Sequence, residues 1–193
     1  MRRQPAKVLE PGDVRRLLAH VERHRYPQRD EVMVLLSFNA GLRACEIAGL
    51  DWPMVLTTDW KVGDTLSICR GIAKFGASRA IPVNPELRRA LGRLHRVEGR
   101  PRDGPIIRSE RNRHMTARSV VNWFGQTYAE LGLTGCSSHS GRRTFITRAA
   151  RALAKSGGSL RDVQELAGHR AITTTERYIQ GNREAQRKLV RMI

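Results

Sequence analysis

The stretch of sequence that decides the fold contains three short motifs, HSGRRT (residues 139–144), LAGHR (166–170) and ERY (176–178). Two imidazoles, a guanidinium and a phenol from this stretch are its candidate reactive groups, those of His139, His169, Arg142 and Tyr178. His139 and Arg142 are three positions apart, so on a helix they share one face. Helical structure in this stretch can therefore gather the four groups at one point.

The charge of the chain indicates which class of molecule would bind at this site. The 193 residues include 35 Lys and Arg against 18 Asp and Glu, which gives a formal net charge of +17 and a pI near 11.3. Nucleic acid is the natural partner of so basic a protein, and a phosphodiester its natural substrate. Charge alone also fits a ribosomal protein, a histone-like packing protein or a binder of membrane surfaces. The hydrophobic content of 40% is ordinary for one globular domain.

The cysteines and the hydropathy of the sequence restrict the cellular compartment in which the protein is expected. The three cysteines, Cys45, Cys69 and Cys136, are isolated and odd in number, so they argue against a disulfide framework and against a zinc site. No apolar run approaches the roughly 18 residues of a membrane span, and no apolar segment follows the arginines at the amino terminus. We therefore expect a reduced intracellular protein without a membrane partner, cytoplasmic and associated with the nucleoid.

Hydrophobic periodicity and capping residues predict an α+β domain that is mostly helical and carries one β-hairpin. The expected elements are helices at 13–24, 31–39, 43–50, 85–97 and 116–131, hairpin strands at 65–73 and 78–83, a short strand at 106–107, and helices after His139, Ser159 and Thr173. Asp13 is the expected N-cap of the first helix, and the last helix would hold Tyr178 near its start. In the helix 116–131, the side chains expected to face the core are Val120, Val121, Phe124 and Leu131.

Four segments, taken in order, resemble the tyrosine recombinases of the phage integrase family: GLRACEIAGL (41–50), KFGASRAIP (74–82), HSGRRT (139–144) and LAGHR continuing to Tyr178. The resemblance covers residues 9 to about 180 and includes the step of nine residues from His169 to Tyr178. It implies a catalytic domain of this family, with a small β-hairpin on one side. One departure is Gly141, where the family usually carries leucine.

The same resemblance implies an active site of six residues: Arg43, Lys74, His139, Arg142, His169 and Tyr178. The two arginines would clamp the scissile phosphate, the lysine would reach the site from the hairpin, and the tyrosine would be the nucleophile. The implied activity is site-specific recombination of double-stranded DNA.

Residue chemistry is consistent with these roles. A phenol keeps its proton at neutral pH, so Tyr178 needs a base, for which His139 is the candidate, and a cationic field that stabilises its anion. Arg43 and Arg142 would neutralise the non-bridging oxygens, a role typically worth ~3 kcal/mol per donor. Lys74 would protonate the leaving 5′-oxygen, and His169 would hydrogen-bond a phosphate oxygen. A covalent 3′-phosphotyrosine keeps the bond energy, so we expect no requirement for ATP, metal or another cofactor.

Other interpretations stay open at this point. Arg43 could instead be a buried ion-pair partner of Glu46, and Lys74 a plain residue of a hairpin turn. A type IB topoisomerase uses the same tyrosine chemistry to relax supercoiled DNA. A non-catalytic DNA-binding protein is the other rival, because residues 160–179 could pass for a helix-turn-helix.

The resemblance also implies how the chain is organised. We expect a catalytic domain at 1–180 and a C-terminal helical tail at 181–193, as in short recombinases that have no separate N-terminal core-binding domain. The tail carries a short apolar stripe of Ala185, Leu189 and Met192. A helix this short gains stability by docking on a protein surface, and by resemblance that surface belongs to a neighbouring protomer. We therefore expect a homo-oligomer on DNA, with a dimer at each site and a tetramer in the synapse.

Overall fold

The computed structural model describes residues 5–73, 78–178, 187 and 190–191. Its elements, in chain order, are α1 (Pro11–Val21), α2 (Pro27–Asn39), α3 (Ala44–Ala48), the 3-10 turn η1 (Trp52–Met54), β1 (Thr65–Ile68), β2 (Arg79–Pro82), α4 (Pro85–Val97), α5 (Ala117–Glu130), α6 (Ser140–Ser156), α7 (Leu160–Ala167) and α8 (Ile172–Glu176). The predicted fold class is confirmed, because the chain is mainly helical and carries one small antiparallel sheet. None of the described helices is long and apolar enough to cross a membrane.

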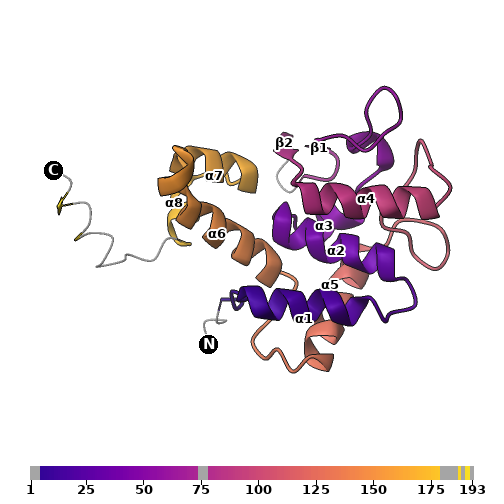
Figure 1. Ribbon diagram of the computed structural model, residues 1–193, viewed down its shortest axis with the longest axis horizontal. Coiled ribbons are helices and arrows are strands. Elements are labelled where there is room, and N and C mark those ends of the chain that lie inside the picture. Colours follow the sequence, from indigo (N-terminus) through magenta and orange to yellow (C-terminus); the bar gives the residue numbers. More distant parts are fainter. Residues whose placement is uncertain (1–4, 74–77, 179–186, 188–189, 192–193) are drawn as a thin grey trace.

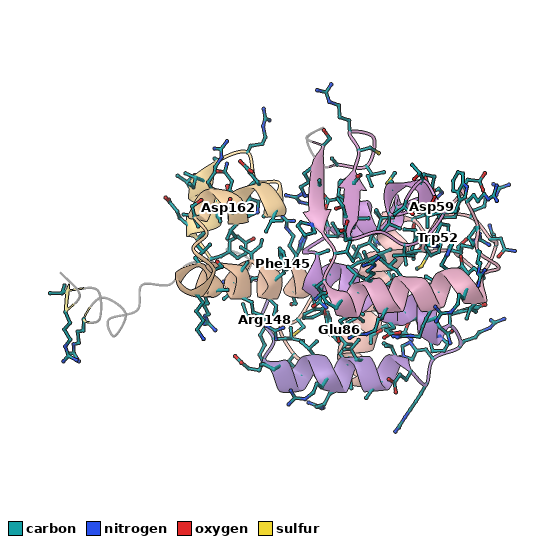
Figure 2. The ribbon with its side chains drawn as sticks, turned by 45° about the horizontal axis from the view of Figure 1, so that its top comes forward. Trp52, Asp59, Glu86, Phe145, Arg148 and Asp162 are labelled. Atoms are coloured by element: carbon teal, nitrogen blue, oxygen red, sulfur yellow. The ribbon has the colours of Figure 1, made fainter. Side chains whose placement is uncertain are left out.

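The molecule has two groups of elements (Figure 1). Helices α1 to α5 and the hairpin surround the larger core, in which α2 is buried over nearly its whole length, from Val32 to Phe38. Helices α6, α7 and α8 surround a smaller core of Ile146, Val163 and Ala167. Phe145, on α6, lies between the two groups (Figure 2). The motifs HSGRRT, LAGHR and ERY therefore belong to a helical unit packed against the main core.

Close contact between α6 and α2 explains the glycine at position 141. A Cβ atom added to Gly141 would lie 2.2 Å from Oγ of Ser37 and 2.9 Å from Cδ2 of Phe38. Thr144, one turn further along α6, accepts a hydrogen bond of 2.9 Å from the backbone N–H of Leu9. The absence of a side chain at Gly141 thus lets α6 approach α2 closely, which a leucine in this backbone arrangement would prevent.

The sheet is a two-stranded hairpin with a short ladder. Strand β1 pairs antiparallel with β2, from Thr65 opposite Pro82 to Ile68 opposite Arg79. Leu66 and Ile68 point into the core, while Thr65 and Ser67 are exposed, which is the alternation expected of a half-buried strand. The strands are shorter than the predicted 65–73 and 78–83. Lys74 lies outside the described residues.

Most predicted helix boundaries follow local capping. Asn84 accepts a hydrogen bond of 2.9 Å from the N–H of Leu87 at the start of α4, and Thr116 accepts one of 3.0 Å from Ser119 at the start of α5. At α7, which begins after Ser159 as predicted, Ser159 and Asp162 form a capping box, and Gly168 ends the helix in the left-handed conformation.

Three local predictions were wrong. The first helix begins at Pro11 rather than at an Asp13 cap, because proline is favoured at the first helical position, and the helix ends at Val21. Val121, expected to face the core, is exposed, whereas Thr127 and Tyr128 of the same helix are buried. Residues Ile106–Ile107 are buried but form no strand.

The structure also corrects the position of the tyrosine. The helix α8 begins after Ala171 and ends at Glu176, so Tyr178 follows the helix instead of lying near its start. Its backbone N–H still donates to the carbonyl of Thr175 at 3.0 Å. Its ring packs against the smaller core from the end of α8.

Candidate active site

Arg43 occupies the turn between α2 and α3. Its backbone N–H and its Nη1 donate to the two oxygens of Glu46, each at 2.9 Å, and its Nη2 lies 3.4 Å from the carbonyl oxygen of Gly168. The side chain is only 12% exposed. The alternative role considered from sequence, an ion pair with Glu46, therefore exists, and the same guanidinium also reaches the LAGHR segment.

Arg142 is the most deeply buried arginine among these groups, with 4% of its surface exposed. Its Nη1 donates to the carbonyl of Gly41 at 2.7 Å, and its Nη2 donates to the carbonyl of Ala167 at 2.5 Å. Burial, and then the nearby charge of Arg43, lower the pKa of Arg142 to about 10. It remains a cation at neutral pH, and it joins α6 to the two segments that flank it.

His169 precedes α8 in the chain and Tyr178 follows it, and their side chains face each other. Their rings are stacked, with centroids 5.8 Å apart and planes inclined by 21°. The Nδ1 atom of His169 lies 3.0 Å from the hydroxyl oxygen of Thr175, a fully buried residue of α8. Burial, followed by the positive charges of Arg142 and Arg43, lowers the pKa of His169 to about 4. The imidazole is therefore neutral at pH 7.

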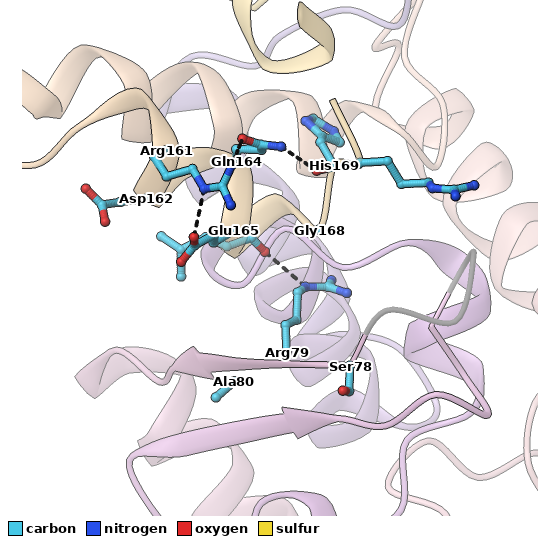
Figure 3. A pocket seen from close by; sticks show the side chains of 11 residues that line it. Ser78, Arg79, Ala80, Arg161, Asp162, Gln164, Glu165, Gly168 and His169 are labelled. Atoms are coloured by element: carbon cyan, nitrogen blue, oxygen red, sulfur yellow. Dashed lines mark hydrogen bonds and ion pairs between the residues drawn. The ribbon is translucent and has the colours of Figure 1, made fainter. Parts of the chain in front are cut away.

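An arginine that the sequence analysis left out completes this cluster. Arg79, at the start of β2, donates from Nη1 and Nη2 to the two oxygens of Glu46, both at 2.9 Å. Its Nε donates to the carbonyl of Leu166 at 3.1 Å, so the hairpin is tied to the end of α7 (Figure 3). Gly168 packs against the same side chain, since an added Cβ would lie 3.0 Å from Nη1 of Arg79.

Glu46 connects Arg43 and Arg79 through ion pairs. Its side chain is fully buried. Burial alone would raise the pKa of this carboxyl, but the hydrogen bonds and charge of Arg79, together with those of Arg43, lower it below its usual value. The carboxylate is therefore ionised, and it fixes the positions of both guanidinium groups.

A cleft of about 720 Å³ opens beside this cluster, between the hairpin and α7 (Figure 3). Three arginines, Arg79, Arg161 and Arg170, line it together with the neutral His169. Its acidic lining residues have partners, because Asp162 caps α7 through Ser159 and Glu165 accepts a hydrogen bond from Arg161. A groove with a buried guanidinium group on the hairpin side and exposed ones on the α7 side suits a phosphate backbone.

Comparison with known proteins matches this arrangement to one family. The sequence profile of the Phage integrase family matches residues 7–185. The chain belongs to the phage integrase family. Two similar relatives are the tyrosine recombinases XerC of Pseudomonas entomophila (strain L48), 32% identical over 156 residues, and of Azotobacter vinelandii, 32% identical over 185 residues. The matches cover 78% and 92% of this chain but 48% and 56% of the relatives, so the chain spans about half their length.

Solved structures share the fold at lower identity. The Tn1549 transposon integrase, in a complex with circular intermediate DNA, superposes with a TM-score of 0.75 at 20% identity and covers 98% of this chain and 67% of that chain. The XerA recombinase gives a TM-score of 0.73 at 18% identity, with 98% and 65% covered. A lambda integrase dimer bound to a core site gives 0.66 at 18% identity, with 91% and 60% covered.

Of the six predicted site residues of this phage integrase chain, the structure brings Arg43, Arg142, His169 and Tyr178 into one cluster. His139 is exposed at the N-terminal end of α6, one turn before Arg142, and its backbone N–H lies 3.3 Å from the hydroxyl of Ser137. Lys74 falls outside the described residues. The roles of all six remain predictions.

Tyr128, another phenol of the chain, lies in the larger core of this integrase domain. It is 1% exposed and stacks on Phe124, with ring centroids 5.8 Å apart. Burial raises its pKa well above the ordinary value, so its phenolate is strongly disfavoured. Tyr178, which is half-buried beside the arginine cluster, is the better placed phenol.

Proposed function

We propose that this chain is the catalytic domain of a site-specific DNA recombinase, which cleaves and rejoins strands through a covalent 3′-phosphotyrosine at Tyr178. The observation that carries the proposal is the meeting of this phenol with His169, Arg142 and Arg43, four groups that come from three separate segments of the chain. Membership in the phage integrase family supports it.

The chemistry follows from the groups in the cluster. The Tyr178 oxygen attacks phosphorus, the bond from phosphorus to the 5′-oxygen breaks, and the 3′-phosphate stays on the tyrosine. Charge grows on the two non-bridging oxygens during this step. Arg43 and Arg142 are held by bonds that do not depend on DNA, so their donors need little reorganisation as that charge develops. Attack by a 5′-hydroxyl on the phosphotyrosine reverses the step and rejoins DNA.

His169 is suited to hydrogen bonding rather than to charge neutralisation. A neutral imidazole has one N–H, and its tautomer is set by the partner of the other nitrogen. When the hydroxyl of Thr175 donates to Nδ1, the hydrogen of His169 lies on Nε2 and can be donated to a phosphate oxygen. Thr175 would then be a positioning residue for His169.

Two roles in the proposal rest on sequence. His139 would accept the proton of Tyr178, and Lys74 would donate a proton to the leaving 5′-oxygen. The phosphate chemistry assigned to the arginine cluster stands without them, since it needs only the guanidinium groups and the phenol.

Double-stranded DNA is the proposed partner, and the chain would act as a dimer at each site and a tetramer in the synapse. The net charge of +17 supports DNA binding. Relatives of the same fold were solved as an integrase with circular intermediate DNA and as a dimer on a core site. The C-terminal segment proposed to contact the neighbouring protomer lies largely outside the described residues.

A suicide substrate tests the proposal. A nicked site that loses its 5′-hydroxyl fragment after cleavage traps the covalent complex, which survives SDS. We expect Tyr178→Phe to bind this DNA nearly as well as the unchanged chain and to form no adduct. Tyr26→Phe is the matched control, because Tyr26 is a partly exposed phenol stacked under Arg29 and removed from the cluster. An SDS-resistant adduct with Tyr178→Phe would refute the proposed nucleophile.

A further inference from the structure

A second cluster of reactive side chains lies where α1 passes the C-terminal end of α5, in the lower part of Figure 1. His20 belongs to the last turn of α1, His24 follows that helix, and Glu130 is the last residue of α5. One ligand atom from each of these three residues can be chosen so that all lie within 4.8 Å of one another. No step of the proposed recombination uses these groups.

The distances are close to those of a metal site. Nε2 of His20 lies 2.9 Å from Oε2 of Glu130, and Nε2 of His24 lies 4.0 Å from the same oxygen. Tetrahedral zinc with bonds of about 2.0–2.1 Å places its ligand atoms about 3.4 Å apart. The observed separations lie on both sides of that value, so small side-chain rotations would seat an ion between the three atoms.

Neighbouring residues orient two of the ligands. Nδ1 of His24 lies 2.9 Å from Oδ2 of Asp30, a buried carboxylate that also accepts hydrogen bonds from Arg29 and Trp123. A carboxylate can only accept, so Nδ1 of His24 carries the hydrogen and Nε2 keeps its lone pair toward Glu130. A histidine ligand supported in this way by a carboxylate is typical of metal sites.

Glu130 is oriented as well. Its Oε1 accepts a hydrogen bond of 3.0 Å from Gln126, one turn earlier on α5, which leaves Oε2 directed at the two imidazoles. The three residues line a cleft of their own, and two arginines that also line it already have carboxylate partners, since Arg29 pairs with Asp30 and Arg25 pairs with Glu110. Their charges therefore oppose an incoming cation less than unpaired arginines would.

We propose that His20, His24 and Glu130 bind a Zn²⁺ ion, which fastens the end of α1 to the end of α5. Two imidazoles and one carboxylate form a ligand set that zinc uses, and a fourth position would be filled by water. The side chains of His20, His24 and Glu130 are 29%, 21% and 40% exposed, so the ion can enter from solvent. The hydrogen now between His20 and Glu130 would move to Nδ1 of His20 when zinc takes its place.

The test uses the full chain after treatment with a chelator and its removal. Zn²⁺ is titrated by calorimetry, and thermal unfolding is followed with and without the ion. We expect one ion per chain and a rise in Tm of about 5–10 °C when zinc is present at about a hundred times its Kd. His20→Gln and Glu130→Gln should each weaken binding by at least about tenfold, because each removes one of three ligands.

His114→Gln is the matched control. His114 makes the same kind of contact, with Nε2 2.9 Å from Oδ1 of Asp51, but it lies outside the cluster. This variant should bind zinc as tightly as the unchanged chain. The proposal fails if the unchanged chain binds no zinc, or if His20→Gln and Glu130→Gln bind it as tightly, since the ion would then be held elsewhere, for example by cysteines.

A spectroscopic readout keeps the test independent of stability. The ring of Trp123 lies 6.1 Å from that of His24, so paramagnetic Co²⁺ or Cu²⁺ at the site should quench its fluorescence. Trp123→Phe should remove the part of the emission that the metal quenches. Quenching that persists unchanged in this variant would place the ion away from His24 and overturn the assignment.

Discussion

Replacing Arg79 with methionine tests whether the buried carboxylate organises the arginine cluster. Methionine keeps most of the length of the side chain but removes the two bonds of 2.9 Å to Glu46 and the bond of 3.1 Å to Leu166. Breaking a buried ion pair by removing one partner costs about 3–5 kcal/mol. Arg43 still pairs with Glu46 after the change, so we expect the lower end, about 3 kcal/mol, and a fall in Tm of about 6–12 °C.

The control for this prediction lies on the same cleft. Arg161 pairs with Glu165 at 3.0 Å, but the two side chains are 69% and 64% exposed. Arg161→Met should therefore lower the free energy of unfolding, measured with urea, by less than about 1 kcal/mol. A double-mutant cycle of Arg79→Met with Glu46→Gln should give a coupling energy of about 1–3 kcal/mol. The reasoning is refuted if Arg79→Met costs no more than Arg161→Met, or if the cycle shows no coupling.

Three further predictions follow from other parts of the chain. The pKa of His169 falls from 6.5 to about 4 on folding, so between these pH values the unfolded chain binds more protons than the folded chain. The free energy of unfolding, measured with urea, should therefore drop as the pH falls from 6.5 toward 4. The variant His169→Gln should lack this part of the drop. Lys74→Ala should cleave an ordinary phosphodiester slowly but a 5′-bridging phosphorothiolate nearly normally, because a thiolate leaves without a proton; equal defects on both would remove Lys74 as the acid. Gly141→Ala should lower the free energy of unfolding by about 1–3 kcal/mol, because the added methyl group forces α6 away from α2. Gly125→Ala, on the open face of α5, should leave this free energy unchanged or raise it. Similar denaturation midpoints for the two variants would contradict the tight contact at Gly141.

The fold was predictable where the deciding interaction is local. The caps at Asn84, Thr116 and Ser159 each satisfy a backbone group within one turn, so the residue type and its spacing reveal them. The same reasoning was wrong near Thr173. The residues Thr173 and Glu176 have the types and spacing of a capping box at a helix start, but both lie inside α8. There the hydroxyl of Thr175 contacts His169 instead, and a side-chain contact of that kind depends on the surrounding packing.

The candidate site was predictable from motif resemblance, and its supporting residues were not. Arg43, Arg142, His169 and Tyr178 stand in recognisable segments and come together in the structure. Arg79 lies 33 positions from Glu46, and neither residue carries a sequence signal for the pair. Likewise, Glu130 lies 110 positions from His20, so the two residues form no spacing motif in the sequence. Cysteine spacing, the sequence signal considered for zinc, does not involve these residues. Such contacts are fixed by the packing of helices and not by local sequence.

The most direct test of the account is to identify the residue that carries the DNA. The adduct trapped on a suicide substrate is digested with trypsin and nuclease, and the modified peptide is sequenced by mass spectrometry. Trypsin should cut after Arg177 and Arg183, so the account predicts a 3′-phosphonucleotide on the first residue of the peptide 178–183, which is Tyr178. A nucleotide on Tyr26 or Tyr128, or a linkage through a 5′-phosphate, would contradict the central claim.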